Sequence, residues 1–149
     1  MPTPNTSTND TSDAAARELI EHSLRTIFAE WVRMLDLRLI DVKPGEVVLA
    51  LPVHKRHIHA GNVMSGQTLM AAADSAMVLA VISKLGAFRP MTTVQLQTSF
   101  LRPIGPDAGE ARVTATVLRL GKTMAFGDIK ITTGDNVLAA HSTTTYALL

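Results

Sequence analysis

The fold of this chain is decided by the segment Ser65-Gly-Gln-Thr-Leu-Met-Ala-Ala-Ala-Asp74-Ser-Ala-Met-Val-Leu-Ala-Val-Ile82. Its alanine, leucine and methionine content predicts a helix. Asp74 is the only formally charged residue between Arg56 and Lys84. A buried carboxylate without a partner costs several kcal/mol, so Asp74 is either a paired structural charge or the working group of a site.

A helix that is apolar on nearly every face must be covered all round, and six strand-like runs are available to cover it. Two of them, 37–42 and 46–53, flank the turn Lys43-Pro-Gly45 and predict a hairpin. The other four follow the helix, at 94–100, 112–117, 123–132 and 137–148. We therefore expect an α+β fold, in which a curved antiparallel six-stranded sheet wraps the central helix and the last four strands form a meander.

The N-terminal part predicts a further helix over 13–35, with Asp13 as its N-cap, because apolar residues recur there at helical spacing. Residues 1–12 are rich in Pro, Thr, Ser and Asn, and lack the basic start and apolar run of a signal peptide. They predict a disordered lead-in to one domain spanning 13–149.

The composition excludes several classes of protein. The chain has 149 residues, 46% of them hydrophobic and 18% charged, which fits one soluble globular domain. A net charge of +1 gives no basic footprint for nucleic acid, and polar residues interrupt the apolar helix too often for a membrane span. The absence of cysteine excludes disulfides and thiolate metal sites, and we expect a cytoplasmic protein.

Several motifs together resemble one known family. They are Ser65-Gly66-Gln67, then Asp74-Ser-Ala-Met77, then Thr93-Val-Gln-Leu-Gln-Thr-Ser-Phe-Leu-Arg-Pro103, and finally Leu120-Gly-Lys122. Over roughly 35–149 the chain resembles the hotdog-fold acyl-CoA thioesterases of the PaaI-like group. The family carries His-Gly-Gly at the start of the central helix, so Ser65 and Gln67 depart from its pattern. The resemblance implies a hotdog fold and hydrolysis of an acyl- or aryl-CoA thioester without a cofactor.

The resemblance also implies roles for two residues. Asp74 would attack the thioester carbonyl or act as a base toward water, and the Gly66 amide at the helix N-terminus would receive the developing oxyanion. A glycine at 66 lets a substrate carbonyl approach the backbone closely.

Four more residues are candidates for the same site, each with an alternative. Ser65 is an N-cap or a substitute for the family histidine, and Gln67 donates to the thioester or covers the helix end. His59 stands where the family often carries an amide, and it contacts substrate or solvent. Thr93 holds the water or the carboxylate, or simply packs on the sheet.

A distance argument gives the site a quaternary requirement. Gly66 and Asp74 are eight positions apart, about 12 Å along a helix. An oxyanion donor and a nucleophile that act on one carbonyl must both lie within about 3 Å of it. Two antiparallel helices, one from each subunit, meet this condition, so we expect a homodimer with shared sites, or a homotetramer built from such dimers.

Positive charges at strand ends are candidates for the phosphates of coenzyme A, namely Lys122, Arg102 and Arg119. Two histidines in His57-Ile-His59 could form a metal pair, but no third ligand lies at a readable spacing, so no metal is expected. Two other functions stay open: an acyl-CoA-binding protein without activity, and a hotdog hydratase or dehydratase, whose sequence signature is absent.

Overall fold

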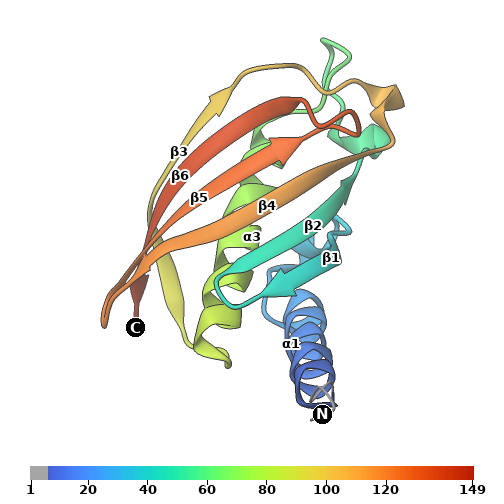
Figure 1. Cartoon of the computed structure of the whole chain (residues 1–149). Coiled ribbons are helices and arrows are strands. Elements are labelled where there is room, and N and C mark those ends of the chain that lie inside the picture. Colours follow the sequence, from blue (N-terminus) through green and yellow to red (C-terminus); the bar gives the residue numbers. More distant parts are fainter. Residues whose placement is uncertain (1–6) are drawn as a thin grey trace.

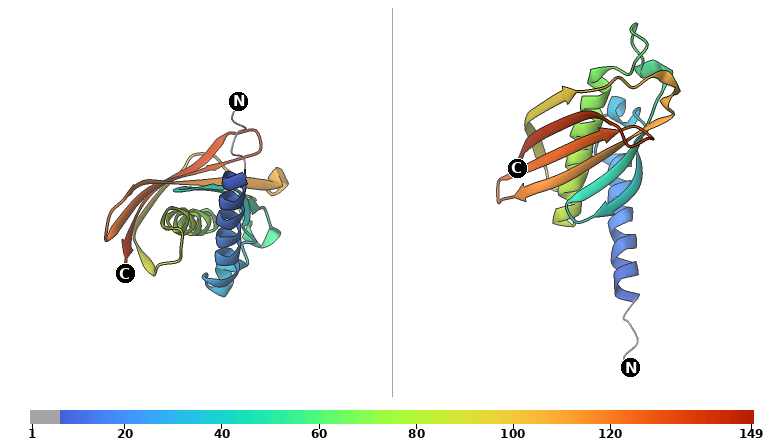
Figure 2. Two further views of the ribbon diagram at one scale, coloured as in Figure 1. Left: turned by 60° about the horizontal axis from the view of Figure 1, so that its bottom comes forward. Right: turned by 45° about the horizontal axis from the view of Figure 1, so that its top comes forward.

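A computed structural model describes residues 7–149 and shows one six-stranded antiparallel sheet curved around a long helix (Figures 1 and 2). The helices are α1 (Ser7–Thr26), α2 (Glu30–Arg33) and α3 (Gly66–Leu85), with short 3-10 turns at Lys55–His57 and Pro106–Ala108. The strands are β1 (Arg38–Lys43), β2 (Glu46–Pro52), β3 (Met91–Phe100), β4 (Glu110–Leu120), β5 (Met124–Thr132) and β6 (Leu138–Leu148). The predicted hotdog architecture is confirmed.

The central helix α3 begins and ends where the sequence predicts. The Ser65 hydroxyl accepts a hydrogen bond from the Thr68 amide at 3.3 Å, which makes Ser65 the N-cap. Gly86 ends the helix in the left-handed conformation, at φ 77°, and its amide donates to the Ile82 carbonyl. By length and hydropathy α3 could cross a membrane, but most of it is buried against the sheet and α1, as a core helix is.

The strand order is β1-β2-β4-β5-β6-β3, so the predicted four-stranded meander is wrong in one respect. Only β4, β5 and β6 form a meander, while β3 pairs with β6 at the far edge of the sheet. The connection 101–109 carries the chain from that edge back to β2, where β4 pairs instead. Pairing depends on long-range packing around α3, and strand alternation alone does not encode it.

The N-terminal helix differs from the expected 13–35 at both ends. It starts at Ser7, inside the segment predicted to be disordered, so Asp13 is an interior residue and not the N-cap; residues 1–6 lie outside the described part of the chain. The helix ends at Thr26, and α2 follows after a break at 27–29. Ile27 and Phe28 pack against the core at this break, and the turn brings Leu35 into the core as well. Tertiary packing overrides the helical pattern here.

The sheet approaches α3 closely at Gly127 of β5. A Cβ at this position would overlap the Met77 thioether of α3, which is fully buried, and would lie 3.2 Å from the Thr116 carbonyl oxygen. Any larger residue would therefore force Met77 to shift; the reason for glycine here is space, because the φ of Gly127 is not positive.

We expect Gly127→Ala to lower the free energy of unfolding by about 2 kcal/mol, because the buried Met77 thioether must shift and the new Cβ also crowds the Thr116 carbonyl oxygen. Chemical denaturation measures the change. Gly134→Ala is the matched control, because nothing lies within 4 Å of a Cβ there, and it should leave stability almost unchanged. Equal stability of the two variants would contradict a close approach of β5 to α3.

Candidate active site

The carboxylate of Asp74 has two partners on the sheet. Asp74 lies in the middle of α3, half-buried, and its Oδ1 accepts a hydrogen bond from the Thr93 hydroxyl of β3 at 2.8 Å. The Tyr146 hydroxyl of β6 lies 2.9 Å from the Asp74 backbone carbonyl oxygen and also contacts Oδ1. Among the described residues, none donates a hydrogen bond to Oδ2. The Asp74 carboxylate is therefore hydrogen-bonded through Oδ1, whereas Oδ2 has no donor in the described part of the chain.

Tyr146 is a site residue that the sequence argument missed. It is 1% exposed, and burial, followed by the neighbouring Asp74 charge, raises the pKa of its phenol. The hydroxyl thus remains a donor at neutral and alkaline pH. The sequence does contain a signal: Tyr146 is the only tyrosine, at an inward position of a strand that alternates buried and exposed residues.

A cleft of about 420 Å³ opens beside Asp74. Its walls come from the α1–α2 break, α2, α3, the α3–β3 connection and the start of β3. Thr93 and Tyr146 line it together with Asp74, so the carboxylate and both of its donors border one space.

The start of α3 forms a second hollow, of about 320 Å³, away from Asp74. Gly66, His59 and Arg102 line it, and the Phe100 ring would lie 3.1 Å from a Cβ on Gly66. The amides of Gly66 and Gln67 have no acceptor within the part of the chain that the structure describes, as is usual in the first turn of a helix. This end of α3 can therefore donate to an anion or an oxyanion.

The His59 ring is hydrogen-bonded within its own turn. Its Nδ1 accepts a hydrogen bond from the Gly61 amide at 2.8 Å, so in the neutral ring the proton is on Nε2. His57, two residues earlier, has a buried Nδ1 without a partner, and burial together with Arg56 lowers its pKa. Within residues 7–149 there is no group of three or more His, Asp and Glu that could hold a metal ion.

The predicted site residues thus fall into three places within one chain. Asp74 and Thr93 meet in the cleft, whereas Gly66, His59 and Arg102 meet at the start of α3. Ser65 caps that helix start, and Gln67 is exposed beside it. Lys122 and Arg119 are exposed at the β4–β5 turn, near the C-terminus and at the end of the sheet away from Gly66 (Figure 1).

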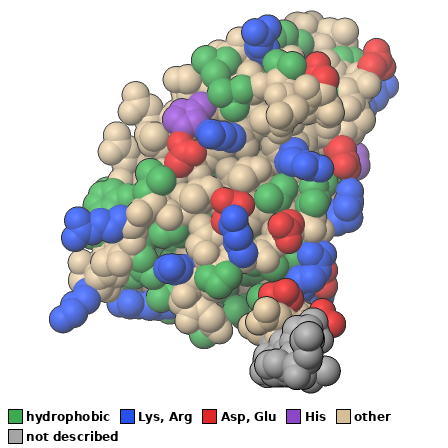
Figure 3. All heavy atoms as spheres, in the orientation of Figure 1, with side chains coloured by type: hydrophobic (Ala, Val, Ile, Leu, Met, Phe, Trp, Pro, Cys, Tyr) green, Lys and Arg blue, Asp and Glu red, His purple; other side chains and the backbone are tan. Residues whose placement is uncertain are grey.

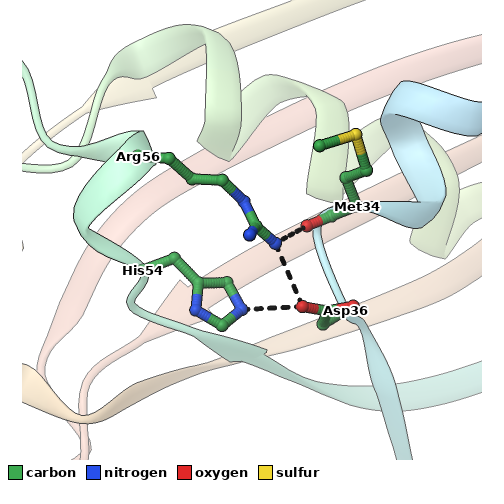
Figure 4. A network of polar contacts seen from close by, with 4 residues as sticks. All are labelled: Met34, Asp36, His54 and Arg56. Carbon is green, nitrogen blue, oxygen red and sulfur yellow. Dashed lines mark hydrogen bonds and ion pairs between the residues drawn. The ribbon is translucent and has the colours of Figure 1, made fainter.

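An ion-pair network connects the wall of the cleft to the loop before α3 (Figure 4). Asp36, which follows α2, accepts from His54 at 2.8 Å and from Arg56 at 3.1 Å. Arg56 also donates to the Met34 carbonyl oxygen. The network holds α2 against this loop, and the loop in turn holds Ser65, whose amide donates to the His57 carbonyl at 2.8 Å.

Comparison with known proteins agrees with this architecture. Residues 57–140 match the model of the thioesterase superfamily. A putative esterase of Thermoplasma volcanium is 30% identical over 107 residues, which cover 72% of this chain and 78% of the esterase. Human acyl-coenzyme A thioesterase 13 is 27% identical over 99 residues, covering 64% of this chain and 67% of that enzyme. The Escherichia coli PaaI protein, from the phenylacetic acid degradation operon, shares the fold at a TM-score of 0.79 and 19% identity, over 92% and 95% of the two chains.

We expect Tyr146→Phe to lower the free energy of unfolding by about 2 kcal/mol, because the buried Asp74 carbonyl and Oδ1 lose a common donor. Thr93→Val is the comparison variant: Thr93 is exposed, so water replaces its hydroxyl and the loss should stay below about 1 kcal/mol. Denaturant unfolding measures both. A Tyr146→Phe protein as stable as the wild type would show that the phenol does not support Asp74.

Proposed function

Because this chain belongs to the thioesterase superfamily, we propose that it is a cytoplasmic acyl-CoA thioesterase, which hydrolyses an acyl-CoA thioester to the free acid and coenzyme A. The observation that carries the proposal is the state of Asp74. One carboxylate oxygen is held by Thr93 and Tyr146, and the other, at the border of an open cleft, has no donor within the described chain. The second oxygen is therefore accessible to a water molecule or a thioester carbonyl in the cleft.

Asp74 acts through Oδ2 in either of two ways. As a base, it takes a proton from water while the water oxygen attacks the thioester carbonyl. As a nucleophile, it forms an acyl anhydride that water then cleaves, which restores the carboxylate. In both cases the C–S bond breaks, coenzyme A leaves as the thiolate and takes up a proton, and the Oδ1 partners keep the carboxylate in place.

The carbonyl oxygen becomes an oxyanion in either route and needs a donor. The Gly66 amide of a second subunit is the proposed donor, because within one chain it is about 12 Å from Asp74 along α3. It has no acceptor among the described residues and lies at the positive end of the helix.

Two surfaces support a second copy of the chain as the partner. In the middle of α3, the residues that the sheet and α1 leave half-buried are Met70, Ala71, Asp74 and Val78, an apolar stripe with the carboxylate within it. The strand β3 pairs with β6 on one side only, and its other edge has no partner within the described chain. Two antiparallel copies of α3 that face each other across the stripe, with the cleft between them, would bring each Gly66 toward the other Asp74.

The coenzyme A part of the substrate would meet positive charges outside the cleft. Arg102 lines the hollow beside Gly66, so the shared site brings it near the thioester, and it is our first candidate for a phosphate partner. Lys122 and Arg119 lie at another end of the sheet and contribute only if the nucleotide extends there.

A protein that binds acyl-CoA without cleaving it is the second candidate. It is favoured by the replacement of the family histidine by Ser65 and of the second glycine by Gln67. Hydrolysis of an acyl-CoA panel by the purified protein distinguishes the two functions.

We expect Asp74→Asn to lower kcat/KM for acyl-CoA hydrolysis by about 10³-fold, because the amide can neither accept a proton nor attack. The fold should persist, since the Asn carbonyl still accepts from Tyr146 and Thr93. Asp41→Asn, an exposed carboxylate on β1, is the control and should retain wild-type activity. Full activity of Asp74→Asn would refute the mechanism, and a wild-type protein inactive on the whole panel would favour the binding protein.

We expect Gly66→Pro to lower kcat by about 10²-fold, because it removes the proposed oxyanion donor. Proline fits the first position of a helix, and the preceding Ser65 has a compatible backbone, at φ −64° and ψ 144°. Gly66→Ala is the matched control: it adds a Cβ against Phe100 but keeps the amide, so it should retain most activity. Equal losses in the two variants would assign the effect to packing.

Mixing the two inactive proteins tests the shared site. A heterodimer of Asp74→Asn and Gly66→Pro subunits has one intact site, so random reassortment should restore about a quarter of the wild-type activity. No restoration in a mixture shown to contain heterodimers would place both residues of a site in one chain.

A further inference from the structure

Asp74 is the one charged residue in the lining of the cleft. The other lining residues are uncharged, and most are apolar, with no Lys, Arg or His among them. The phosphates of coenzyme A require positive charges or free amides, which lie at the start of α3 and at the β4–β5 turn. The outer face of the sheet, in contrast, carries side chains of both signs side by side (Figure 3). The cleft therefore suits the other half of the substrate.

Two exposed aromatic rings border this cleft. Trp31 of α2 is 63% exposed and Phe88 of the α3–β3 connection is 54% exposed. Phe28, at the α1–α2 break, adds a third ring that packs on the core. Large rings left open at the border of a cleft indicate an apolar occupant, because covering them releases ordered water. Rings also favour flat or ring-bearing groups through offset and edge contacts.

The wall that carries Trp31 is fixed. The helix α2 has only four residues, but the contacts of Asp36 and Arg56 anchor the chain directly behind it (Figure 4). Val32, the next residue of α2, also lines the cleft and packs on the core. The backbone position of Trp31 is thus set by the fold, as a selectivity wall requires.

We infer that this cleft holds the acyl group, that it selects uncharged apolar acyl groups, and that Trp31 and Phe88 determine this specificity. The inference rests on the proposed function, since it places the thioester carbonyl at Asp74. An acyl group with its own carboxylate is rejected, because it would lie near the Asp74 charge without any cation to offset the repulsion. The volume, about 420 Å³, lies in the lower part of the usual range for small-ligand pockets and suits a ring or a medium-length chain.

Binding can be measured without turnover, because Trp31 is the only tryptophan. In the Asp74→Asn protein, hexanoyl-CoA and phenylacetyl-CoA should shift the indole emission to shorter wavelength, since the acyl group removes water from the ring. Coenzyme A alone should leave the emission unchanged, because it carries no acyl group. An unchanged emission with both hexanoyl-CoA and phenylacetyl-CoA would overturn the inference, whether or not the wild type hydrolyses thioesters.

Selectivity is the second readout. In the wild type, kcat/KM for hexanoyl-CoA and phenylacetyl-CoA should exceed that for acetyl-CoA and succinyl-CoA by about tenfold or more, as one or two buried apolar groups allow. Trp31→Ala and Phe88→Ala should reduce this preference, mainly by raising KM for hexanoyl-CoA and phenylacetyl-CoA. Phe88→Arg should raise kcat/KM for succinyl-CoA relative to kcat/KM for hexanoyl-CoA. Leu118→Ala, an exposed leucine of β4 outside the cleft, is the control and should keep the wild-type preference.

The outcomes separate this inference from the proposed function. Acyl preferences that survive Trp31→Ala and Phe88→Ala in an active enzyme would overturn the inference and leave thioester hydrolysis standing. A change of oligomeric state in Trp31→Ala with unchanged acyl preference would assign the exposed indole to a subunit contact instead. A wild type that cleaves no thioester, while the emission of Trp31 still shifts with hexanoyl-CoA, would refute hydrolysis and retain the acyl site.

Discussion

The rest of the structure depends on one constraint: the apolar helix α3 must be shielded from water on all sides. This helix is apolar on nearly every face, so water must be excluded from it all round, and a flat sheet on one side could not do so. The chain meets the requirement with a curved six-stranded sheet and with α1 on the side that the sheet leaves open (Figure 2). The cover within one chain is incomplete along Met70, Ala71, Asp74 and Val78, and that stripe is where the chemistry is proposed to occur.

The cost of placing a carboxylate in such a helix explains the form of the site. A charge removed from water must be compensated by donors, and Tyr146 and Thr93 supply them from two adjacent strands of the sheet. Their hydroxyls donate hydrogen bonds to Oδ1, and Oδ2 has no donor among the described residues. The compensation of the charge and the accessibility of its second oxygen thus come from the same pair of contacts. Fixing Asp74 at one oxygen also orients the other, which would reduce the reorganisation needed for the proposed reaction.

Local patterns in the sequence predicted those parts of the fold that depend on neighbouring residues. Ser65 and Gly86 at the ends of α3 and the Lys43-Pro-Gly45 turn are recognisable from a few positions each, because capping and turn geometry are local. The place of β3 beside β6 was not recognisable, since alternation identifies a strand but not its partner. The break at 27–29 was missed for a related reason: it contains no proline or glycine, and only packing of Ile27 and Phe28 against the core produces it.

The sequence by itself determined that a lone charge lies within an apolar helix, that strands must surround it, and that Gly66 and Asp74 are too far apart to serve one carbonyl in a single chain, because helix rise is fixed at about 1.5 Å per residue. Only the tertiary structure decided which side chains satisfy that charge. Tyr146 lies 72 positions from Asp74 in the chain, and no local rule connects them. Their contact exists because the sheet curves around α3 and brings an inward position of β6 against the middle of the helix.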